Sequence, residues 1–226
     1  MMKNNIRNVL MRYLAATAGL FLVAVGVALS IESDLGTAPV SCPPYVAHLC
    51  GGALTVGEYT GLMHLLFIVF QMVLLGRRFK AAYLMQVPAA VVFGALTDIA
   101  IGAFSWLDIS SYAGRLALTM AAVAVTALGV SMEVLPQAWM LAGEQTVWAL
   151  SEKTGVRYDK MKVCFDVFLV VASAAFSFIF FRSPFGNGHE FVIREGTIIF
   201  AICTGLCMRL TDPLVKKMFG KIISGS

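Results

Sequence analysis

The sequence predicts an all-α membrane protein, and three observations lead to this fold class. Of its 226 residues, 59% are hydrophobic and only 13% are charged, whereas a soluble domain carries about 25% charged residues. The mean hydropathy is +0.82. Six apolar segments reach the length of about 20 residues that a spanning helix needs. We therefore expect six transmembrane helices, at 12–31, 58–76, 81–103, 114–134, 161–181 and 192–214.

Lys and Arg are unevenly distributed between the ends of these predicted helices. Thirteen of the 17 basic residues fall in the N-terminal segment, around 76–80, around 153–162 and in the C-terminal segment. Short cytoplasmic loops carry such an excess of positive charge. We therefore expect both termini in the cytoplasm. The net charge of +4 then reflects membrane topology, and nucleic acid is not an expected partner.

Each half of the chain has the same order of long and short apolar segments. FLVAVGVALSIE at 21–32 precedes a proline-containing break and a short apolar segment at 39–49. AVTALGVSMEVL at 124–135 likewise precedes a proline-containing break and a short apolar segment at 138–151. Two long apolar segments then complete each half. The order predicts an internal repeat with an offset of about 100 residues.

An odd number of spans per half makes this repeat an inverted one. The predicted single membrane domain, 1–226, consists of a first repeat at 1–110 and a second at 111–226. With three spans each, the second half must enter the membrane upside down relative to the first. Inverted repeats of this kind are the architecture of many secondary transporters.

The two short segments are too short to cross a bilayer, which needs about 20 residues. Each is expected to be a short helix that is either re-entrant or interfacial, and the sequence leaves both alternatives open. In the first, Thr37 is a suitable N-cap, and Pro39 suits a first helical turn because no N–H is required there. A re-entrant helix would direct free N–H groups at a cavity, because non-helical backbone at membrane depth must be satisfied by protein or by water.

Two short motifs resemble a known family. GTAP at 36–39 follows the first span and LTVG at 54–57 opens the second, and both are similar to the YczE/YyaS/YitT type of bacterial multipass integral membrane protein. Length and span number agree over nearly the whole chain. The resemblance implies a location in the bacterial cytoplasmic (inner) membrane but no particular activity. The chain has Val40 and Ser41 where the family pattern has an aromatic residue and an acid, which implies a different ligand if that pair contacts one.

Five polar side chains inside the apolar segments are candidates for binding a solute or ion. An ionisable side chain at a helix centre costs roughly 2.5–3.5 kcal/mol on insertion scales, so each needs a reason. His64 lies in the second span and Asp166, a lone aspartate, at a comparable depth in the fifth. Glu133 ends the fourth span, and Glu144 and Gln145 lie in the second short segment. For His64 the alternative is a neutral imidazole bonded to a backbone carbonyl.

Three further candidates lie in the first break: Asp34, Thr37 and Ser41. A solvated acid in an outer loop is the alternative for Asp34. Two other charges near the ends of spans have simpler expected roles. Asp98 is expected to reach outer water.

Arg209 lies in the last span, near its end. We expect its side chain to extend to the membrane surface, with Asp212 as a candidate partner one turn on.

The remaining composition gives no sign of enzymatic chemistry. The five cysteines form no CxxC pair, and Cys42 and Cys50 are eight residues apart, about 12 Å along a helix, which exceeds the roughly 7 Å limit for a disulfide. Hydrolase, P-loop and metalloprotease motifs do not occur. We therefore expect no catalytic residues, no metal site and no cofactor.

The best functional prediction is a secondary transporter of a small polar solute that works by alternating access, with proton coupling as an option. Its expected partners are the lipid bilayer, the solute and protons. Three alternatives stay open: a substrate-binding subunit of a multi-component importer, a non-transporting membrane accessory factor, and a channel. Small-residue stretches such as 15–19 suit packing within the fold or a homo-oligomer interface.

Overall fold

A computed structural model describes residues 2–136, 138, 140–188 and 190–223. Six helices among these residues are long and apolar enough to cross a membrane, as predicted. Two short helices follow the first and fourth of them, also as predicted, although residue 139 lies outside the described residues. The elements are α1 (Met2–Glu32), η1 (Pro39–Ser41), α2 (Cys42–Leu49), α3 (Val56–Leu75), η2 (Gly76–Arg78), η3 (Ala81–Met85), α4 (Gln86–Phe104), α5 (Tyr112–Val134), α6 (Ala142–Thr154), α7 (Tyr158–Phe181) and α8 (Glu195–Ile223).

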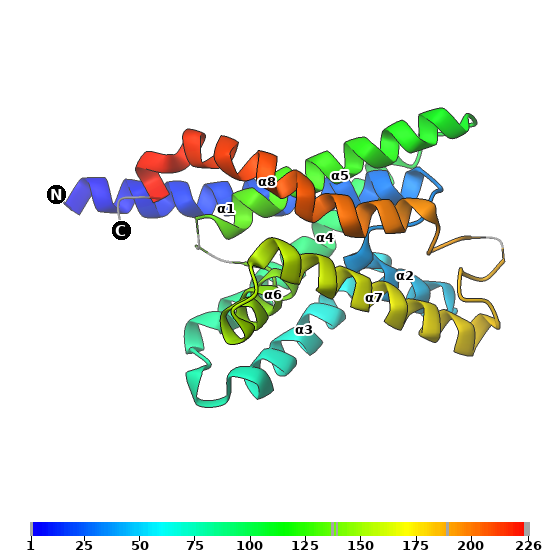
Figure 1. Cartoon of the computed structure of the whole chain (residues 1–226), viewed down its shortest axis with the longest axis horizontal. Coiled ribbons are helices and arrows are strands. Elements are labelled where there is room, and N and C mark those ends of the chain that lie inside the picture. The colour runs from blue at the N-terminus through cyan, green and yellow to red at the C-terminus, as the bar shows by residue number, and fades with distance from the viewer. Residues whose placement is uncertain (1, 137, 139, 189, 224–226) are drawn as a thin grey trace.

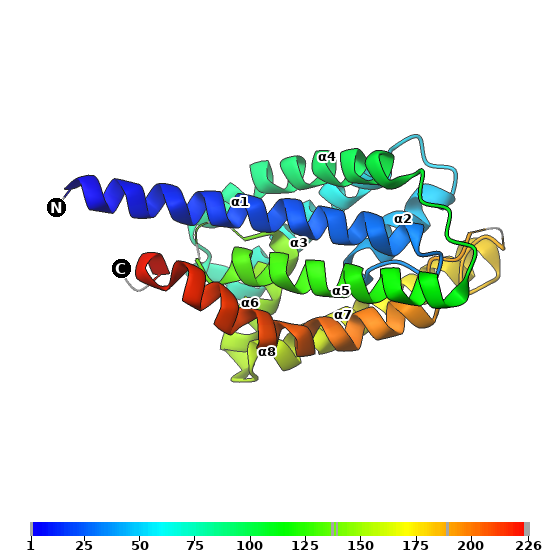
Figure 2. The same ribbon diagram turned by 90° about the horizontal axis from the view of Figure 1, so that it is seen from above.

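The helices form two layers. In the first, α4, α1, α5 and α8 lie side by side in that order (Figure 2). The second layer contains α3, α7 and the short helices α2 and α6 (Figure 1). The start of α1, the end of α8 and the connection at 76–80 lie at one end of the bundle. We call this end the basic end, because most Lys and Arg residues are found there.

Helix packing in the second half repeats that in the first. Helix α1 packs on α4 as α5 packs on α8, and α3 packs on α4 as α7 packs on α8. Each short helix contacts the same two partners, since α2 contacts α3 and α7 while α6 contacts α7 and α3. Every helix of the first half therefore has a counterpart with equivalent neighbours.

Glycines bring α1 and α5 together at the centre of the first layer. A Cβ atom built on Gly19 would lie 2.6 Å from the carbonyl oxygen of Gly129, and one on Gly129 would lie 2.7 Å from that of Gly19. A second contact has a Cβ on Gly26 at 3.1 Å from the carbonyl oxygen of Ala122. Small residues at such positions let two membrane helices approach to backbone contact.

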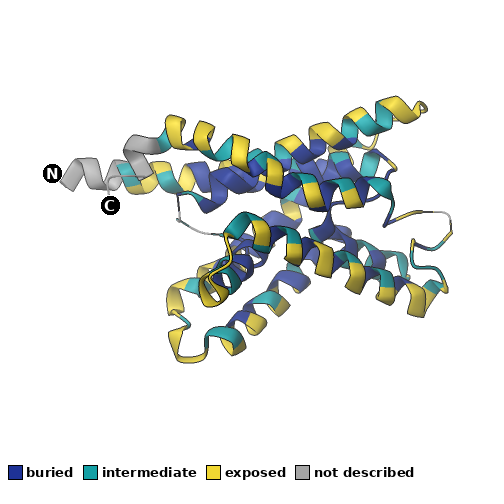
Figure 3. Ribbon diagram, in the orientation of Figure 1, coloured by how far each residue is buried: buried dark blue, intermediate teal, exposed yellow. Residues whose placement is uncertain are grey.

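The core lies where the layers meet, and the outer faces are apolar. Figure 3 shows the buried residues concentrated along the middle of the molecule and the exposed ones on the outer sides of the helices. Phe93 and Phe200 are the largest fully buried apolar side chains. Leu66, Val73 and Phe168 are among many large apolar side chains that are exposed. Apolar surface of this extent suits contact with lipid tails rather than water.

The helix start that follows the first break differs from the one expected. Thr37 does not cap the following helix: its backbone N–H donates to the carbonyl of Val192 at 2.9 Å, and its hydroxyl lies 3.3 Å from the Cys42 sulfur. The turn η1 begins one residue later, after Ala38, whose N–H donates to the Ser30 hydroxyl at 3.0 Å. The last turn of α1 therefore satisfies this N–H, and Pro39 occupies the first turn as expected.

Asp98 is partly exposed, and its carboxylate also holds the start of α3. Its carboxylate accepts hydrogen bonds from the Thr55 hydroxyl at 2.6 Å and from the Gly57 N–H at 2.8 Å. The start of a helix offers free N–H groups and a partial positive charge, so an acid is favourable there.

Arg209 makes the corresponding contact in the second half. Its guanidinium pairs with Asp159, at the start of α7, at 2.7 Å. The expected partner Asp212 instead accepts a hydrogen bond from the Ser131 hydroxyl at 2.7 Å. The pairing with Asp212 is thus wrong, because α8 presents Arg209 to the neighbouring helix α7.

Candidate functional site

The candidate site is a buried cluster of charges built around Lys162. The Lys162 ammonium lies 2.9 Å from an oxygen of Asp166, one turn along α7, and 3.1 Å from an oxygen of Glu144 at the start of α6. All three side chains are at most 7% exposed. The Tyr158 hydroxyl donates a hydrogen bond to the other Glu144 oxygen. Asp166 is therefore not a lone acid, and Lys162 is not a loop residue.

Glu133 adds a third carboxylate to this cluster. It lies near the end of α5, is fully buried, and accepts a hydrogen bond from the Leu141 N–H just before α6. Two of the three acids pair with the one ammonium, and Glu133 has no ion-pair partner among the described residues, so the described cluster has more potential negative charge than positive.

His64 lies at the same end of α6 as Glu144. Its Nδ1 accepts a hydrogen bond from the Gly143 N–H at 3.3 Å, so this nitrogen is bonded to a backbone N–H and not to the backbone carbonyl of the alternative interpretation. Phe67 and Phe93 contact the imidazole ring edge-on, at centroid separations of 5.9 and 5.6 Å. The imidazole is therefore fixed in orientation, with Nδ1 as the acceptor.

Four buried polar side-chain atoms, two of them in His64 and Glu133, have no hydrogen-bond partner among the described residues. They are Nε2 of His64, Oε2 of Glu133, and the hydroxyls of Ser41 and Thr126. A buried polar atom without a partner costs roughly 1–3 kcal/mol. Such atoms are rare in stable structures, and those of His64 and Glu133 leave hydrogen-bonding capacity unused beside the cluster.

A second polar network lies beside the cluster and contains no charge. The Gln71 amide donates to Gln86 at 2.9 Å and to the Thr146 hydroxyl at 3.1 Å, and Gln86 donates back to Gln71 at 3.0 Å. These bonds join α3 and α4 to α6. Gln145, the next residue along from Glu144, lines a cavity of about 440 Å³ that opens between α6 and the connection before α4. This cavity leads from the basic end towards the start of α6.

The predicted residues of the first break lie apart from the cluster. Asp34 is half exposed at the end of the bundle opposite the basic end, where it pairs with Arg115 and accepts a hydrogen bond from Arg194 at 2.7 Å. Thr37 and Ser41 are buried at the start of η1 and α2.

Cys42 follows the first break and is fully buried, with its thiol 3.3 Å from the Thr37 hydroxyl. Burial raises the pKa of this thiol to about 12. The thiol therefore stays protonated and is a poor nucleophile.

The sequence reading missed Lys162 and Tyr158 as members of the site. Lys162 counts in the sequence among the basic residues around 153–162 that indicate the cytoplasmic end, and Tyr158 is not among the predicted site residues. The spacing of Lys162 and Asp166, four residues apart on one helix face, is the signal that predicts their contact. Tyr158 carries no such signal, because its partner Glu144 lies on another helix.

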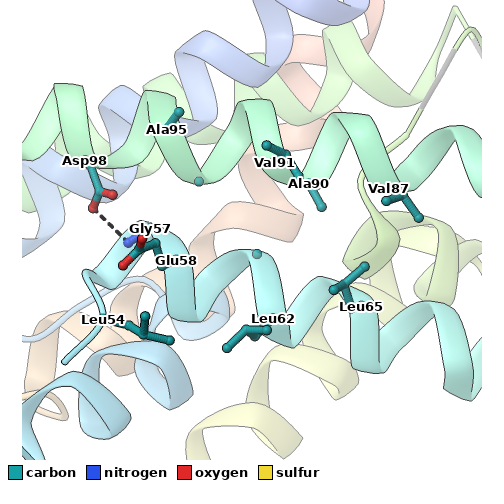
Figure 4. A pocket seen from close by; sticks show the side chains of 12 residues that line it. Leu54, Gly57, Glu58, Leu62, Leu65, Val87, Ala90, Val91, Ala95 and Asp98 are labelled. Carbon is teal, nitrogen blue, oxygen red and sulfur yellow. Dashed lines mark hydrogen bonds between the residues drawn. The ribbon is translucent and has the colours of Figure 1, made fainter. Parts of the chain in front are cut away.

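Another cavity lies on the lipid-facing side, between α3 and α4. It has a volume of about 530 Å³ and is lined mainly by apolar and small residues of both helices. Figure 4 shows Leu62, Leu65 and Val91 along its walls and Asp98 at one end, bonded to Gly57. None of the charged cluster residues lines it, so it is not part of the candidate site.

Six long apolar helices, lipid-compatible outer faces and a buried charged centre define a multipass membrane protein. The chain belongs to a family of unknown function, DUF6198, whose model matches residues 10–213. No curated protein and no solved structure matches the chain. The resemblance to the YczE/YyaS/YitT type stays a prediction.

Proposed function

We propose that this protein is a secondary transporter that moves a small polar solute through the buried cluster by alternating access. The observation that carries the proposal is the cluster itself: three carboxylates, one lysine and a histidine, all buried between helices of both halves. Ionisable side chains at membrane depth are costly and typically mark ion or solute pathways. Glu133, Glu144, Gln145, His64 and Asp166 are the residues that we assign to it.

The packing of the two halves supports an inverted repeat. Equivalent helices have equivalent neighbours, and the contact of Gly19 with Gly129 is matched by that of Gly26 with Ala122. If Gly26 corresponds to Gly129, as the aligned sequences indicate, Gly19 corresponds to Ala122. The two contacts then exchange under a two-fold rotation, as expected for inverted repeats in a transporter.

The polar side-chain contacts at the starts of α3 and α7 also correspond between the two halves. Asp98 contacts the start of α3, and Arg209 contacts the start of α7. Each lies four residues after a glycine of its helix, Gly94 or Gly205, that packs against the same helix start. His64 and Asp166 also correspond, each eight residues after the first residue of its helix.

Burial of the short helices supports the re-entrant alternative. The first six residues of α6, 142–147, are all buried, whereas its last three are exposed. A helix lying flat on the membrane would expose one face along its whole length. Helix α2 has no exposed residue at all. Both helices thus start inside the protein. Free N–H groups are available to a ligand at the start of α6, whereas at α2 the residues Pro43 and Pro44 lack an N–H and Cys42 donates its own to Ala38.

Charge balance favours protons or a cationic group as the transported or coupled species. With three carboxylates and one ammonium, the described cluster is balanced only when protons or a cation supply the missing positive charge. A zwitterionic solute fits as well, with its ammonium at the carboxylates and its carboxylate at the start of α6. We propose a bacterial cytoplasmic membrane location with both termini inside, supported by the positive charge gathered at the basic end.

The proposal is tested in proteoliposomes that enclose a pH-sensitive dye. Small amines and amino acids are applied singly, and the solute-dependent proton flux is measured. Glu144→Gln and Asp166→Asn remove one charge each while keeping the shape of the side chain, and we expect at least a tenfold loss of flux. Asp108→Asn, which changes an exposed acid, is the matched control and should retain full flux. Full flux in both cluster variants would exclude these acids from transport.

A non-transporting accessory factor is the second candidate. It would tolerate the two neutral replacements, because its buried acids would serve only packing. An importer subunit would need no symmetry between its halves, so the matched contacts favour the carrier over it.

A further inference from the structure

A basic groove separate from the cluster lies at the basic end of the bundle. It has a volume of about 730 Å³, within the range of roughly 300–1,000 Å³ typical of ligand clefts. One wall is formed by the end of α3 and by η2, and the other by the last turns of α6. Its cations are Arg77, Arg78, Lys80 and Lys153.

The four cations of this groove have no ion-pair partner among the described residues. Every described ion pair involves other basic side chains. Glu152 is the one acid lining the groove. The groove therefore carries a net excess of positive charge that nothing in the described structure neutralises.

The groove also has an apolar side. Leu74, Leu75 and Phe79 line it together with Tyr83, and Leu74, Leu75 and Phe79 are half-buried. Leu74 and Leu75 belong to the last turn of a membrane-spanning helix. Cations and the apolar end of a span thus meet in one cleft, at the depth where lipid headgroups join their acyl chains.

We propose that this groove binds the phosphate headgroup of an anionic phospholipid, with the acyl chains against Leu74, Leu75 and Phe79. Arg77 and Arg78 supply planar donors that match phosphate oxygens, while Lys80 and Lys153 act as point charges. Basic pockets between membrane helices at the positively charged side bind such headgroups elsewhere. The bound lipid bridges the α3–α4 connection to α6.

This position connects the lipid to the element that carries Glu144. Helix α6 extends from the cluster to the groove, and Glu144 and Lys153 are nine residues apart, about 14 Å along the helix. A lipid that fixes the end of α6 therefore also restrains its start. The binding claim does not depend on the proposed transport activity and is tested without it.

The test measures lipid binding to the purified full-length protein by native mass spectrometry. Phosphatidylglycerol is the probe, and phosphatidylcholine with the same chains is the neutral reference. The variant Arg77→Gln/Arg78→Gln/Lys153→Gln removes three charges from the groove. We expect at least tenfold weaker phosphatidylglycerol binding and unchanged phosphatidylcholine binding.

A matched control removes the same charge from the same end of the molecule. Lys160→Gln/Lys216→Gln/Lys217→Gln changes three exposed lysines outside the groove and should bind phosphatidylglycerol as the wild type does. Size-exclusion chromatography confirms that both variants are folded, and a groove variant that fails this test is replaced by Arg77→Gln/Arg78→Gln. Equal loss in groove and control variants, or no loss in the groove variant, would overturn the proposal.

A further arm separates lipid from free phosphate. Glycerol phosphate carries the same charged group without acyl chains. We expect it to displace phosphatidylglycerol only at concentrations at least a hundredfold higher than that of the lipid. Displacement at equal concentration would mean that the groove takes free phosphate, and the lipid assignment would be wrong.

Discussion

At the residue scale, Lys162 decides whether the interior cluster is stable. Its ammonium is the one cation in contact with both Glu144 and Asp166 among the described residues. Both acid side chains are nearly inaccessible to water, so hydration could not compensate their charges if the ammonium were removed. Removing one partner of a buried ion pair costs about 3–5 kcal/mol, because the remaining charge is left uncompensated.

Lys162→Met should therefore destabilise the protein strongly. A loss of about 3–5 kcal/mol lowers Tm by roughly 10 °C in a protein of this size, at 2–4 °C per kcal/mol. Thermal unfolding in detergent measures the shift. Lys160→Met removes an exposed charge from the same helix and should change Tm by less than about 2 °C. Equal shifts in the two variants would show that the buried ion pairs contribute nothing to stability.

The candidate site could be predicted in part because the acids stand out in apolar segments. Glu144 and Asp166 are each isolated among apolar neighbours, and the structure brings them onto the same ammonium. Lys162 was assigned to a loop because its position near a basic segment satisfied the charge rule for cytoplasmic loops. Contacts between helices, such as Tyr158 with Glu144, depend on packing that a single sequence does not encode locally.

At the element scale, the close approach of α1 and α5 depends on two glycines. The backbone carbonyls of Gly19 and Gly129 occupy the space that a side chain on the other would need. No rotamer change relieves such a contact, because both partners are backbone. The two helices at the centre of the first layer must separate if either glycine is replaced.

Gly129→Ala should destabilise the protein even though Ala is a better helix former. Overpacking at a close contact costs about 1–3 kcal/mol, which exceeds the gain of roughly 1 kcal/mol from replacing Gly in a helix. Gly102→Ala is the control, because nothing lies within 4 Å of its Cβ position. Tm should fall for Gly129→Ala and stay constant or rise for Gly102→Ala. A fall of the same size in both would remove the packing explanation.

The elements themselves were predictable, and their caps were less so. The six spans and two short helices follow from apolar length and proline position, and the structure has all eight. The cap of the first short segment was wrong because η1 starts after Ala38 and has no side-chain cap, while the Thr37 hydroxyl lies 3.3 Å from the Cys42 sulfur.

At the scale of the whole molecule, successive spans run in opposite directions, so the connections between them lie alternately at the two ends of the bundle. The connection at 105–111 and the residues 182–188 and 190–194 lie away from the basic end, whereas the start of α1 and the end of α8 lie at it (Figure 1). Because the number of spans is even, the start of α1 and the end of α8 must lie at the same end. The distribution of Lys and Arg then predicts which end faces the cytoplasm.

Cysteine labelling on intact cells tests this orientation. In a background without the five native cysteines, Ser110→Cys and Thr154→Cys place one exposed thiol at each end. A membrane-impermeant maleimide should label Ser110→Cys on intact cells, and Thr154→Cys only after permeabilisation. The reverse pattern would place the basic end outside and contradict the charge rule for this chain.

The central claim, alternating access to the interior cluster, is tested most directly at the starts of the two short helices. Ser41 begins the first and Gly143 lies at the start of the second, and both are buried. Ser41→Cys and Gly143→Cys, in the cysteine-free background, are exposed to membrane-impermeant reagent from each side separately. We predict that each thiol is labelled from both sides, more slowly than an exposed thiol, because the interior opens to one side at a time. Labelling from one side only, or from neither, would contradict alternating access.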